Sequence, residues 1–140
     1  MHTPDGHLPI ELTPVGHVES TLTDAAAAPK QGVEGAPDAT VVIAAEYAAA
    51  LADVHAGTDV VLLTWLDRAR RDVLAVHPRD DRSRPVTGVF ATRSQDRPNP
   101  IGLHRVHVLS VDGLRLRVRD LEALDGTPVL DVKLALHGER

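Results

Sequence analysis

Apolar and polar residues alternate most clearly between residues 103 and 120, where two alternating runs meet at Asp112-Gly113. Alternation with a period of two is typical of a strand with one buried face, and Asp-Gly between two such runs is a strong hairpin signal. In the second run, Leu114, Leu116 and Val118 alternate with Arg115, Arg117 and Arg119. The pattern therefore predicts an antiparallel hairpin that buries aliphatic side chains and presents arginines to solvent.

Shorter apolar runs predict the other elements. The continuous run DVVLLTWL at residues 59–66 has the length of a buried strand. The remaining strands are predicted at residues 12–20, 40–44 and 86–92, with a short one at 73–76 and a last one within 121–136, after a turn at Asp125-Gly126. Residues 46–57 are rich in Ala and Leu and stop at Gly57, which predicts a helix with a glycine C-cap.

These elements amount to about seven strands and one helix, and helices do not regularly separate the strands. A doubly wound parallel sheet is therefore disfavoured. We predict a mainly β fold, namely a small, mostly antiparallel, partly closed β-barrel with one or two short helices. The expected organisation is a disordered N-terminus at residues 1–11, a single barrel domain at 12–136 and a tail at 137–140.

Composition limits the classes of chemistry that are open to the chain. There is no cysteine, and each of Phe, Trp and Tyr occurs once among 140 residues. Disulfides and thiolate sites are excluded, the core must be aliphatic, and a reducing cytoplasm is the expected compartment. We find no secretory signal and no apolar run near the roughly 20 residues of a membrane helix, so we expect a soluble protein without membrane contact.

The net charge of −5 is distributed unevenly. Residues 1–60 hold nine acids and one base, Lys30, whereas residues 78–119 hold nine arginines and four aspartates. The mean charge argues against a general nucleic-acid binder, but the central segment can form a local anion-binding face.

The segment GVFATRSQDRPNPIGLH, residues 88–104, combines two arginines with two X-Pro steps and two glycines. The prolines hold Arg97 and Asn99 in extended conformations. One interpretation is a rigid turn in which Arg93 and Arg97 pair with acids such as Asp96. The other is a ligand site, because the segment lies between two predicted strands, where a barrel mouth holds a ligand. Position favours the ligand site.

Two further features have an ordinary and a functional interpretation. LDGTPVLD at residues 124–131 contains a common turn, but Asp125 can accept from a ribose or an amine, and the Gly126 and Thr127 amides can meet a base edge. The histidines form no recognisable metal motif, and His104 and His107, three apart on a strand, face opposite sides. We predict no metal.

GVFATRSQDRPNPIGL followed by LDGTPVLDVK resembles the TsaA-like family of S-adenosylmethionine-dependent methyltransferases. Its best-known members are tRNA threonylcarbamoyladenosine N6-methyltransferases. Weaker similarity extends the resemblance to residues 12–134. It implies a small β-barrel that forms a homodimer and binds S-adenosylmethionine near the subunit interface. In this family a serine follows PIGL, where this chain has His104, and Pro-Tyr follows the lysine that corresponds to Lys133.

The resemblance also implies a set of cofactor-binding residues. One wall consists of Arg93, Pro98, Asn99, Ile101, Gly102 and Leu103, a second of Asp125, Gly126, Thr127 and Pro128, and the remainder of Lys30, Gln31, Gly32, Asp67 and Arg68. Arg93 is expected to hold the methionine carboxylate or to shape the loop, and Asp125 to face the adenosine or the amine. Lys133, His104 or Asp131 are the candidates to orient or deprotonate the acceptor.

The resulting functional hypothesis is N6-methylation of threonylcarbamoyladenosine in the tRNA anticodon loop. Within methyl transfer, the alternative acceptor is a small metabolite or peptide. A second hypothesis, motivated by His104 and by the residues after Lys133, is a module that binds S-adenosylmethionine without turnover.

Overall fold

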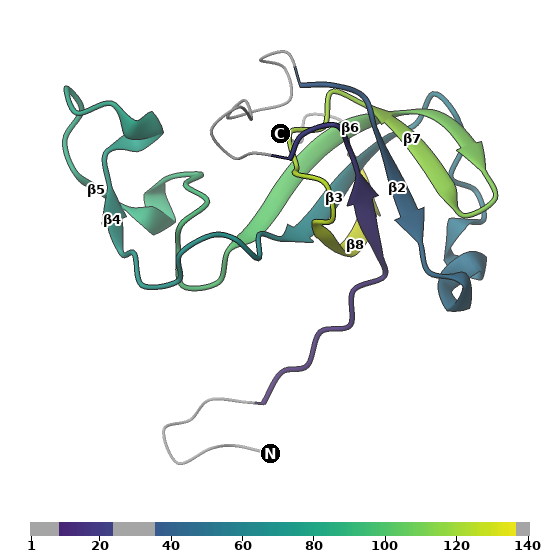
Figure 1. Cartoon of the computed structure of the whole chain (residues 1–140), viewed down its shortest axis with the longest axis horizontal. Coiled ribbons are helices and arrows are strands. Elements are labelled where there is room, and N and C mark those ends of the chain that lie inside the picture. The colour runs from purple at the N-terminus through teal and green to yellow at the C-terminus, as the bar shows by residue number, and fades with distance from the viewer. Residues whose placement is uncertain (1–8, 24–35, 137–140) are drawn as a thin grey trace.

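Six antiparallel strands form a closed barrel (Figure 1). The computed structural model describes residues 9–23 and 36–136, and all structural statements concern these residues. In barrel order the strands are β1 (Gly16–Glu19), β2 (Ala39–Ile43), β7 (Arg115–Arg119), β6 (Ile101–Asp112), β3 (Asp59–Trp65) and β8 (Pro128–Leu134). The predicted mainly β barrel is confirmed, and pairing of β1 with β8 closes it completely.

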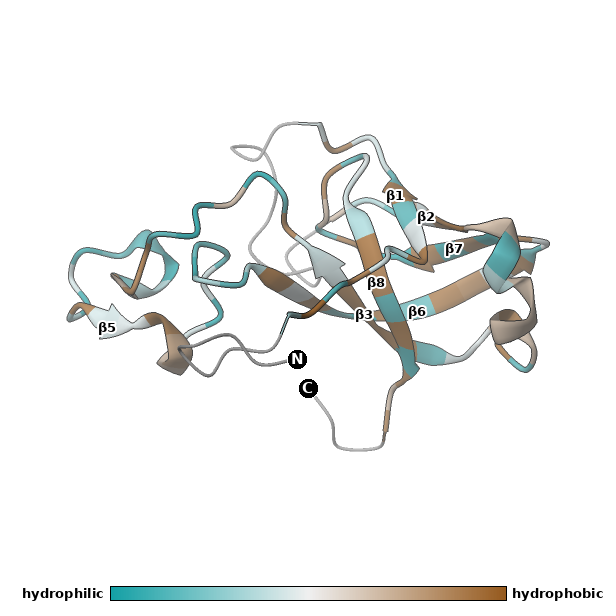
Figure 2. Ribbon diagram, turned by 90° about the horizontal axis from the view of Figure 1, so that it is seen from below, coloured by the Kyte–Doolittle hydropathy of each residue, from teal (hydrophilic) through white to brown (hydrophobic). Residues whose placement is uncertain are grey.

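The barrel interior is filled by aliphatic side chains, as the scarcity of aromatic residues requires. Fully buried positions alternate along the strands and include Val18, Val41, Leu62, Val108, Leu116, Val118 and Val129. Leu121 and Ala123, which follow β7, complete this core from one end. Figure 2 shows the same alternation as bands of hydrophobic and hydrophilic residues along β6 and β8.

The hairpin of β6 and β7 follows the predicted pattern. Leu116 and Val118 are buried, the three arginines of β7 are exposed, and Gly113 at the turn has a φ of 58°. A register shift between Leu63 and Thr64 interrupts the pairing of β3 with β8, so that Leu130 is the extra residue of a β-bulge. On either side of this bulge, Val129 points inward and Asp131 outward.

An arm at residues 66–100 projects from the barrel (Figure 1). It contains β4 (Ala75–Val76), η4 (Pro78–Asp80), β5 (Thr87–Gly88) and η5 (Val89–Ala91), and β4 pairs with β5. The strand predicted at residues 86–92 is therefore wrong beyond Gly88. Its apolar residues instead enter a turn, because the carbonyl oxygen of Val89 accepts hydrogen bonds from Arg97 and Thr92.

The helix predicted at residues 46–57 is also wrong in type and extent. A 3-10 helix, η3 (Ala45–Leu51), forms instead, and none of its residues is buried. Gly57 has a φ of 92°, but its amide donates to Val108 O at 2.8 Å rather than capping a helix. The hydrogen bond to β6 fixes the end of this alanine-rich segment, which has no fully buried residue in η3 and packs against the core through the partly buried Tyr47, Leu51 and Val54. No helix of the described residues is long and apolar enough to cross a membrane.

Asp59, at the start of β3, joins β3 to β6 through its side chain. Its carboxylate accepts from His107 Nδ1 at 2.7 Å and from Arg105 Nη2 at 3.3 Å. The hydrogen bond from His107 is the main cause that lowers the pKa of Asp59 below its usual value of 3.8. The ionised carboxylate therefore stabilises the fold above pH 3.8, and this contribution is lost as the pH falls through the lowered pKa.

We expect Asp59→Asn to reduce the free energy of unfolding at about pH 5 by up to about 1 kcal/mol, because the side chain is 41% exposed. At about pH 2.5 the difference from the wild type should shrink. Urea unfolding at both pH values measures this difference in the free energy of unfolding. The matched control is Asp112→Asn, since Asp112 is exposed and makes no ion pair within the described chain. An equal loss at both pH values would contradict the prediction.

Candidate functional site

Residues 92–100 and 120–127, which include Arg93 and Asp125, lie at one end of the barrel, here called the loop end. β3 runs into this end at Trp65, and β6 leaves it at Ile101, directly opposite in the sheet. The segment after β7 crosses the end and inserts Leu121 and Ala123 into the core. The two sequence motifs, which lie more than 20 residues apart, therefore reach the same end of the barrel.

Arg97 has a structural role inside the first motif. Its guanidinium donates to the carbonyl oxygens of Ser94 at 2.7 Å, Val89 at 2.8 Å and Thr92 at 2.7 Å. Three backbone acceptors around one planar fork fix the course of residues 89–97. The pairing with Asp96 that the rigid-turn interpretation invoked is absent, since Asp96 accepts the Arg70 amide instead.

Arg71 secures the other half of this motif, and the sequence reasoning missed it. Its Nε donates to Pro98 O at 2.7 Å and its Nη2 to Asn99 Oδ1 at 3.0 Å. The guanidinium also lies 5.1 Å from the centroid of the Trp65 ring. The only signal in the sequence is the basic run RARRD that follows the tryptophan-bearing strand.

Arg93 is different from both of these arginines. Its side chain is exposed and forms no hydrogen bond or ion pair with any described residue. Because residues on both sides of it are braced by Arg97 and Arg71, a free guanidinium is held on a fixed backbone. Such a group is suited to a carboxylate or a phosphate.

The second motif forms a turn against β1. Ser20 N donates to Asp125 Oδ1 at 3.0 Å, and Gly126, with a φ of 84°, donates its amide to Val18 O at 2.7 Å. The Thr127 amide donates to Leu124 O at 3.1 Å. Both amides that were expected to meet a base edge are therefore engaged within the chain, whereas Asp125 itself is exposed.

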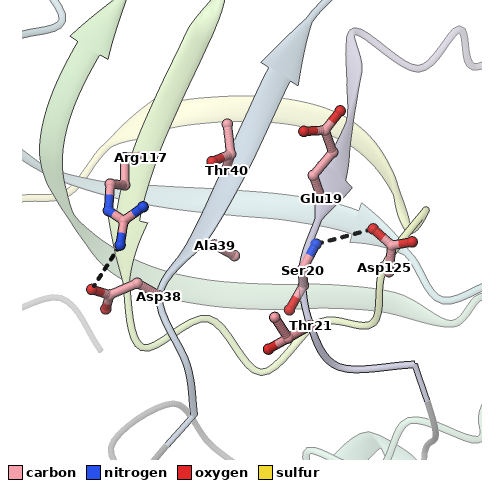
Figure 3. Close-up of a pocket in the computed structure, with 8 residues that line it drawn as sticks. All are labelled: Glu19, Ser20, Thr21, Asp38, Ala39, Thr40, Arg117 and Asp125. Atoms are coloured by element: carbon pink, nitrogen blue, oxygen red, sulfur yellow. Dashed lines mark hydrogen bonds and ion pairs between the residues drawn. The ribbon is translucent and has the colours of Figure 1, made fainter.

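Asp125 borders a polar hollow of about 530 Å³ on the outside of β1, β2 and β7 (Figure 3). The lining residues are Glu19, Ser20, Thr21, Asp38, Ala39, Thr40, Arg117 and Asp125. Arg117 lies 3.8 Å from Asp38 and Arg115 lies 2.6 Å from Glu19, so two of the three carboxylates are paired with arginines and Asp125 is the third. A hydrogen bond from Arg115 lowers the pKa of Glu19, so that side chain stays ionised. Asp125 is therefore the carboxylate in this hollow that can accept from a hydroxyl group or an amine.

A smaller apolar hollow of about 250 Å³ lies beside Trp65. It is lined by Ile10, Leu12, Pro14, Trp65, Pro128 and Leu130. Asp125 and Pro128, predicted to form one wall, thus border two different hollows. Ile101 and Leu103 lie on the outer face of β6 and are each about two fifths exposed.

The predicted acceptor-side residues do not come together. His104 points into the barrel and is buried, whereas Asp131 and Lys133 are exposed on the outer face of β8, with Lys133 Nζ 3.8 Å from Asp131 Oδ2. Gly102 also faces inward, where a Cβ would lie 2.2 Å from Thr64 Oγ1. Internal packing therefore explains why residue 102 is a glycine, and close approach of a ligand is not needed to explain it.

The remaining predicted cofactor-binding residues lie after β3 or outside the described part of the chain. Asp67 and Arg68 are exposed directly after β3, and Arg68 Nη1 donates to Thr23 O at 3.2 Å. Lys30, Gln31 and Gly32 lie outside the described residues. On β7, Arg115 and Arg117 pair with Glu19 and Asp38. Over residues 9–23 and 36–136, no group of three or more His, Asp or Glu side chains is arranged to hold a metal ion.

The family model described as the tRNA-methyltransferase O N-terminal domain matches residues 17–137. The solved structure of TrmO from Pseudomonas aeruginosa superposes with a TM-score of 0.75 at 28% identity, covering 92% of this chain and 57% of that one. Two relatives from Archaeoglobus fulgidus are 44% and 43% identical and cover 89% and 87% of this chain. They are named a probable S-adenosyl-L-methionine-binding protein and an S-adenosyl-L-methionine-binding protein.

The lengths of these proteins differ. The match covers 33% of the first Archaeoglobus relative and 86% of the second. This chain therefore spans a third of one curated relative and just over half of the solved TrmO chain.

We expect Arg97→Lys to loosen the arm while the barrel stays folded, because an ammonium cannot reach three separate carbonyl oxygens at once. The loss should be about 1–3 kcal/mol of local stability. Hydrogen exchange should accelerate at the amides of Val89 and Thr92 and remain unchanged at Val41 and Val118. Arg82→Lys is the control, because Arg82 is exposed on the same arm and has no partner among the described residues. Unchanged exchange in Arg97→Lys would contradict the structural role.

Proposed function

Because the chain belongs to the family of the tRNA-methyltransferase O N-terminal domain, we propose that it methylates N6 of threonylcarbamoyladenosine in the tRNA anticodon loop, with S-adenosylmethionine as donor. Membership of the TsaA-like family, expected from the two motifs, is confirmed by the match over residues 17–137. The acceptor and the activity are the proposal. The observation that carries it is the contrast between Arg97, which is bound to carbonyl oxygens of its own loop, and Arg93, which has no partner among residues 9–23 and 36–136.

The residues at the loop end fit the chemistry of S-adenosylmethionine. Arg93 offers a guanidinium for its carboxylate, and the acid-rich hollow beside Asp125 offers acceptors for ribose hydroxyls or an amine. The names of the Archaeoglobus relatives support the same cofactor. When bound, S-adenosylmethionine would supply a methyl group on a cationic sulfonium. The acceptor nitrogen would bond to the methyl carbon as the carbon–sulfur bond breaks, leaving S-adenosylhomocysteine and releasing the proton of the nitrogen to solvent.

The chain itself contributes orientation, which supplies most of the rate in a displacement of this kind. In the proposed mechanism Arg93 binds the donor carboxylate, and Arg71 and Arg97 keep the loop in one conformation. Asp125, held through one oxygen by the Ser20 amide, accepts a hydrogen bond from the ligand with the other. The exposed Arg119 is available for phosphate contacts.

A second candidate function is S-adenosylmethionine binding without turnover. It is favoured by one observation: His104 is buried, and Lys133 and Asp131 pair with each other on the far face of β8. None of the three therefore faces the hollow beside Asp125. A third possibility within methyl transfer is a small metabolite or peptide acceptor, since two arginines of β7 are already paired with acids.

We also propose that the chain acts as a homodimer, in which each site borrows residues from the partner. The arm carries Leu74, Val86 and Phe90 with exposures of 70%, 63% and 86%. Figure 2 shows the hydrophobic η5 at the outer part of an otherwise largely hydrophilic arm. Exposed apolar residues held on an ordered projection are typical of an interface.

We expect the wild-type protein to transfer label from S-adenosylmethionine to tRNA that lacks the methyl group, and Arg93→Ala to weaken cofactor binding about tenfold or more. Arg82→Ala, which removes another exposed arginine of the arm, should leave the affinity unchanged. Calorimetry gives the affinity, and nucleoside analysis identifies the product.

Each result distinguishes among the candidate functions. Cofactor binding without any methylated nucleoside would favour the binding module, whereas a labelled small molecule in place of tRNA would favour the metabolite acceptor. A steep loss of tRNA affinity with salt would support phosphate contacts. No binding of S-adenosylmethionine at millimolar concentration would refute the proposed function.

We expect Phe90→Asp to convert the dimer into a monomer, because a carboxylate is readily solvated in the free chain but costly to bury in an interface. Light scattering should give twice the chain mass of 15.0 kDa for the wild type and the chain mass for the variant. Arg82→Ala should remain dimeric. A wild-type species of 15.0 kDa that binds the cofactor tightly would contradict the dimer.

A further inference from the structure

A chain of three polar side chains lies inside the barrel at the loop end. His104 Nδ1 is 2.5 Å from Glu122 Oε1, and His104 Nε2 is 2.7 Å from Thr64 Oγ1. Thr64 is fully buried, and the side chains of His104 and Glu122 are 5% and 13% exposed. The three residues come from β3, β6 and the segment that follows β7, and they are here called the His104 cluster.

The connectivity of this cluster equals that of a hydroxyl–imidazole–carboxylate catalytic triad. The His104 cluster differs from a catalytic triad because a substrate cannot reach its hydroxyl group. The Thr64 side chain points into the barrel interior and is fully buried, so no substrate carbonyl can approach its Oγ1. A nucleophilic role for Thr64 and a direct acid–base role for His104 are therefore excluded by burial, and the cluster must act through the residues beside it.

The surrounding residues are shaped to hold this arrangement. Gly102 is opposite Thr64 in the sheet, and a Cβ there would lie 2.6 Å from His104 Nε2 as well as 2.2 Å from Thr64 Oγ1. The absence of a side chain at Gly102 thus creates the space that the hydrogen bond needs. Both ring nitrogens have partners, which offsets the cost of burying the imidazole in an aliphatic core.

The three members lie next to the segments that carry the proposed cofactor residues. Thr64 comes just before Trp65 and Asp67, His104 follows Leu103 directly, and Glu122 precedes Asp125 by three positions. β3 and β6 are already joined by backbone hydrogen bonds, so their relative position is fixed without the cluster. The segment at residues 120–127 has no such ladder to β6. The contact between Glu122 and His104 is its direct polar link to that strand.

We propose that Thr64, His104 and Glu122 are positioning residues that set the distance between the two walls of the cofactor site. This inference rests on the proposed function. In it, Nδ1–H of His104 donates to the Glu122 carboxylate, and the Thr64 hydroxyl donates to Nε2. The imidazole thereby fixes Glu122 against the strand that leaves the Arg93 loop. It acts together with the hydrogen bonds from the Asp125 amide to Leu22 O and from the Gly126 amide to Val18 O, which hold the turn at Asp125 against β1.

The test compares Glu122→Ala with the conservative Glu122→Gln, whose amide oxygen can still accept from Nδ1–H. Glu122→Ala should weaken S-adenosylmethionine binding about tenfold and accelerate hydrogen exchange at the amides of Asp125, Gly126 and Thr127. It should also change the ¹⁵N shifts of the His104 ring. Glu122→Gln should stay close to the wild type in all three measurements.

Val108→Ala serves as the control for stability alone. Val108 is fully buried, lies four positions beyond His104 on β6 and pairs with Val118. The control should lower the melting temperature without affecting the exchange of residues 125–127 or the cofactor affinity. If Glu122→Ala fails to fold, Thr64→Val, which breaks only the Nε2 contact, provides the same comparison.

The proposal is overturned if Glu122→Ala and Val108→Ala change affinity and loop exchange equally, or if exchange at residues 125–127 stays at the wild-type rate. Failure of the wild type to bind S-adenosylmethionine would count against the proposed function instead. The exchange rates and the His104 shifts would still report whether the cluster positions the loop.

Discussion

Closure of the barrel depends on a short contact between β1 and β8. Only Gly16 and His17 pair with Val129 and Pro128, yet this contact joins the first and last strands of a six-stranded sheet. Three backbone hydrogen bonds extend it beyond the ladder, from Val15 to Val129, from Val18 to Thr127 and from Gly126 to Val18. Because the last two involve the turn next to Asp125, the closure that removes the sheet edges also positions one wall of the candidate site.

A small barrel also explains how a chain with three aromatic residues obtains a well-packed interior. In a closed sheet of six strands, valine and leucine from opposite sides fill the space without larger rings. The three aromatic residues are therefore not needed to fill the barrel interior. Trp65 packs against Arg71 at the loop end, Phe90 is exposed on the arm, and only Tyr47 packs against the core.

The features that were predictable from the sequence are those that depend on local alternation. The β6–β7 hairpin, the buried strand at residues 59–65 and the turn at Asp125-Gly126 follow from period, run length and turn chemistry. The segments at residues 46–57 and 86–92 were mispredicted because contacts from distant residues decide their conformation. The Val108 carbonyl oxygen accepts a hydrogen bond from the Gly57 amide, and the Arg97 guanidinium donates to the carbonyl oxygens around η5.

The same limit applies to the candidate site. In the sequence, Arg93 and Arg97 are two equivalent cations of one loop. Only the fold shows that Arg97 donates to backbone carbonyl oxygens and that Arg93 is exposed without a partner among the described residues. Arg71 contacts residues 27 and 28 positions away, and Thr64 is 40 positions from His104. No periodicity links residues at these separations, so their partnership could not have been predicted.

The bulge in β8 has a consequence for how the chain can change length. A residue inserted into a regular strand would exchange the inward and outward faces of everything beyond it. Here Leu130 is the extra residue, and Val129 and Asp131 already face opposite sides around it. The bulge holds one extra residue, so deletion of residue 130 would leave Val129 facing inward and Asp131 outward, and both the core and the outer surface would keep their pattern.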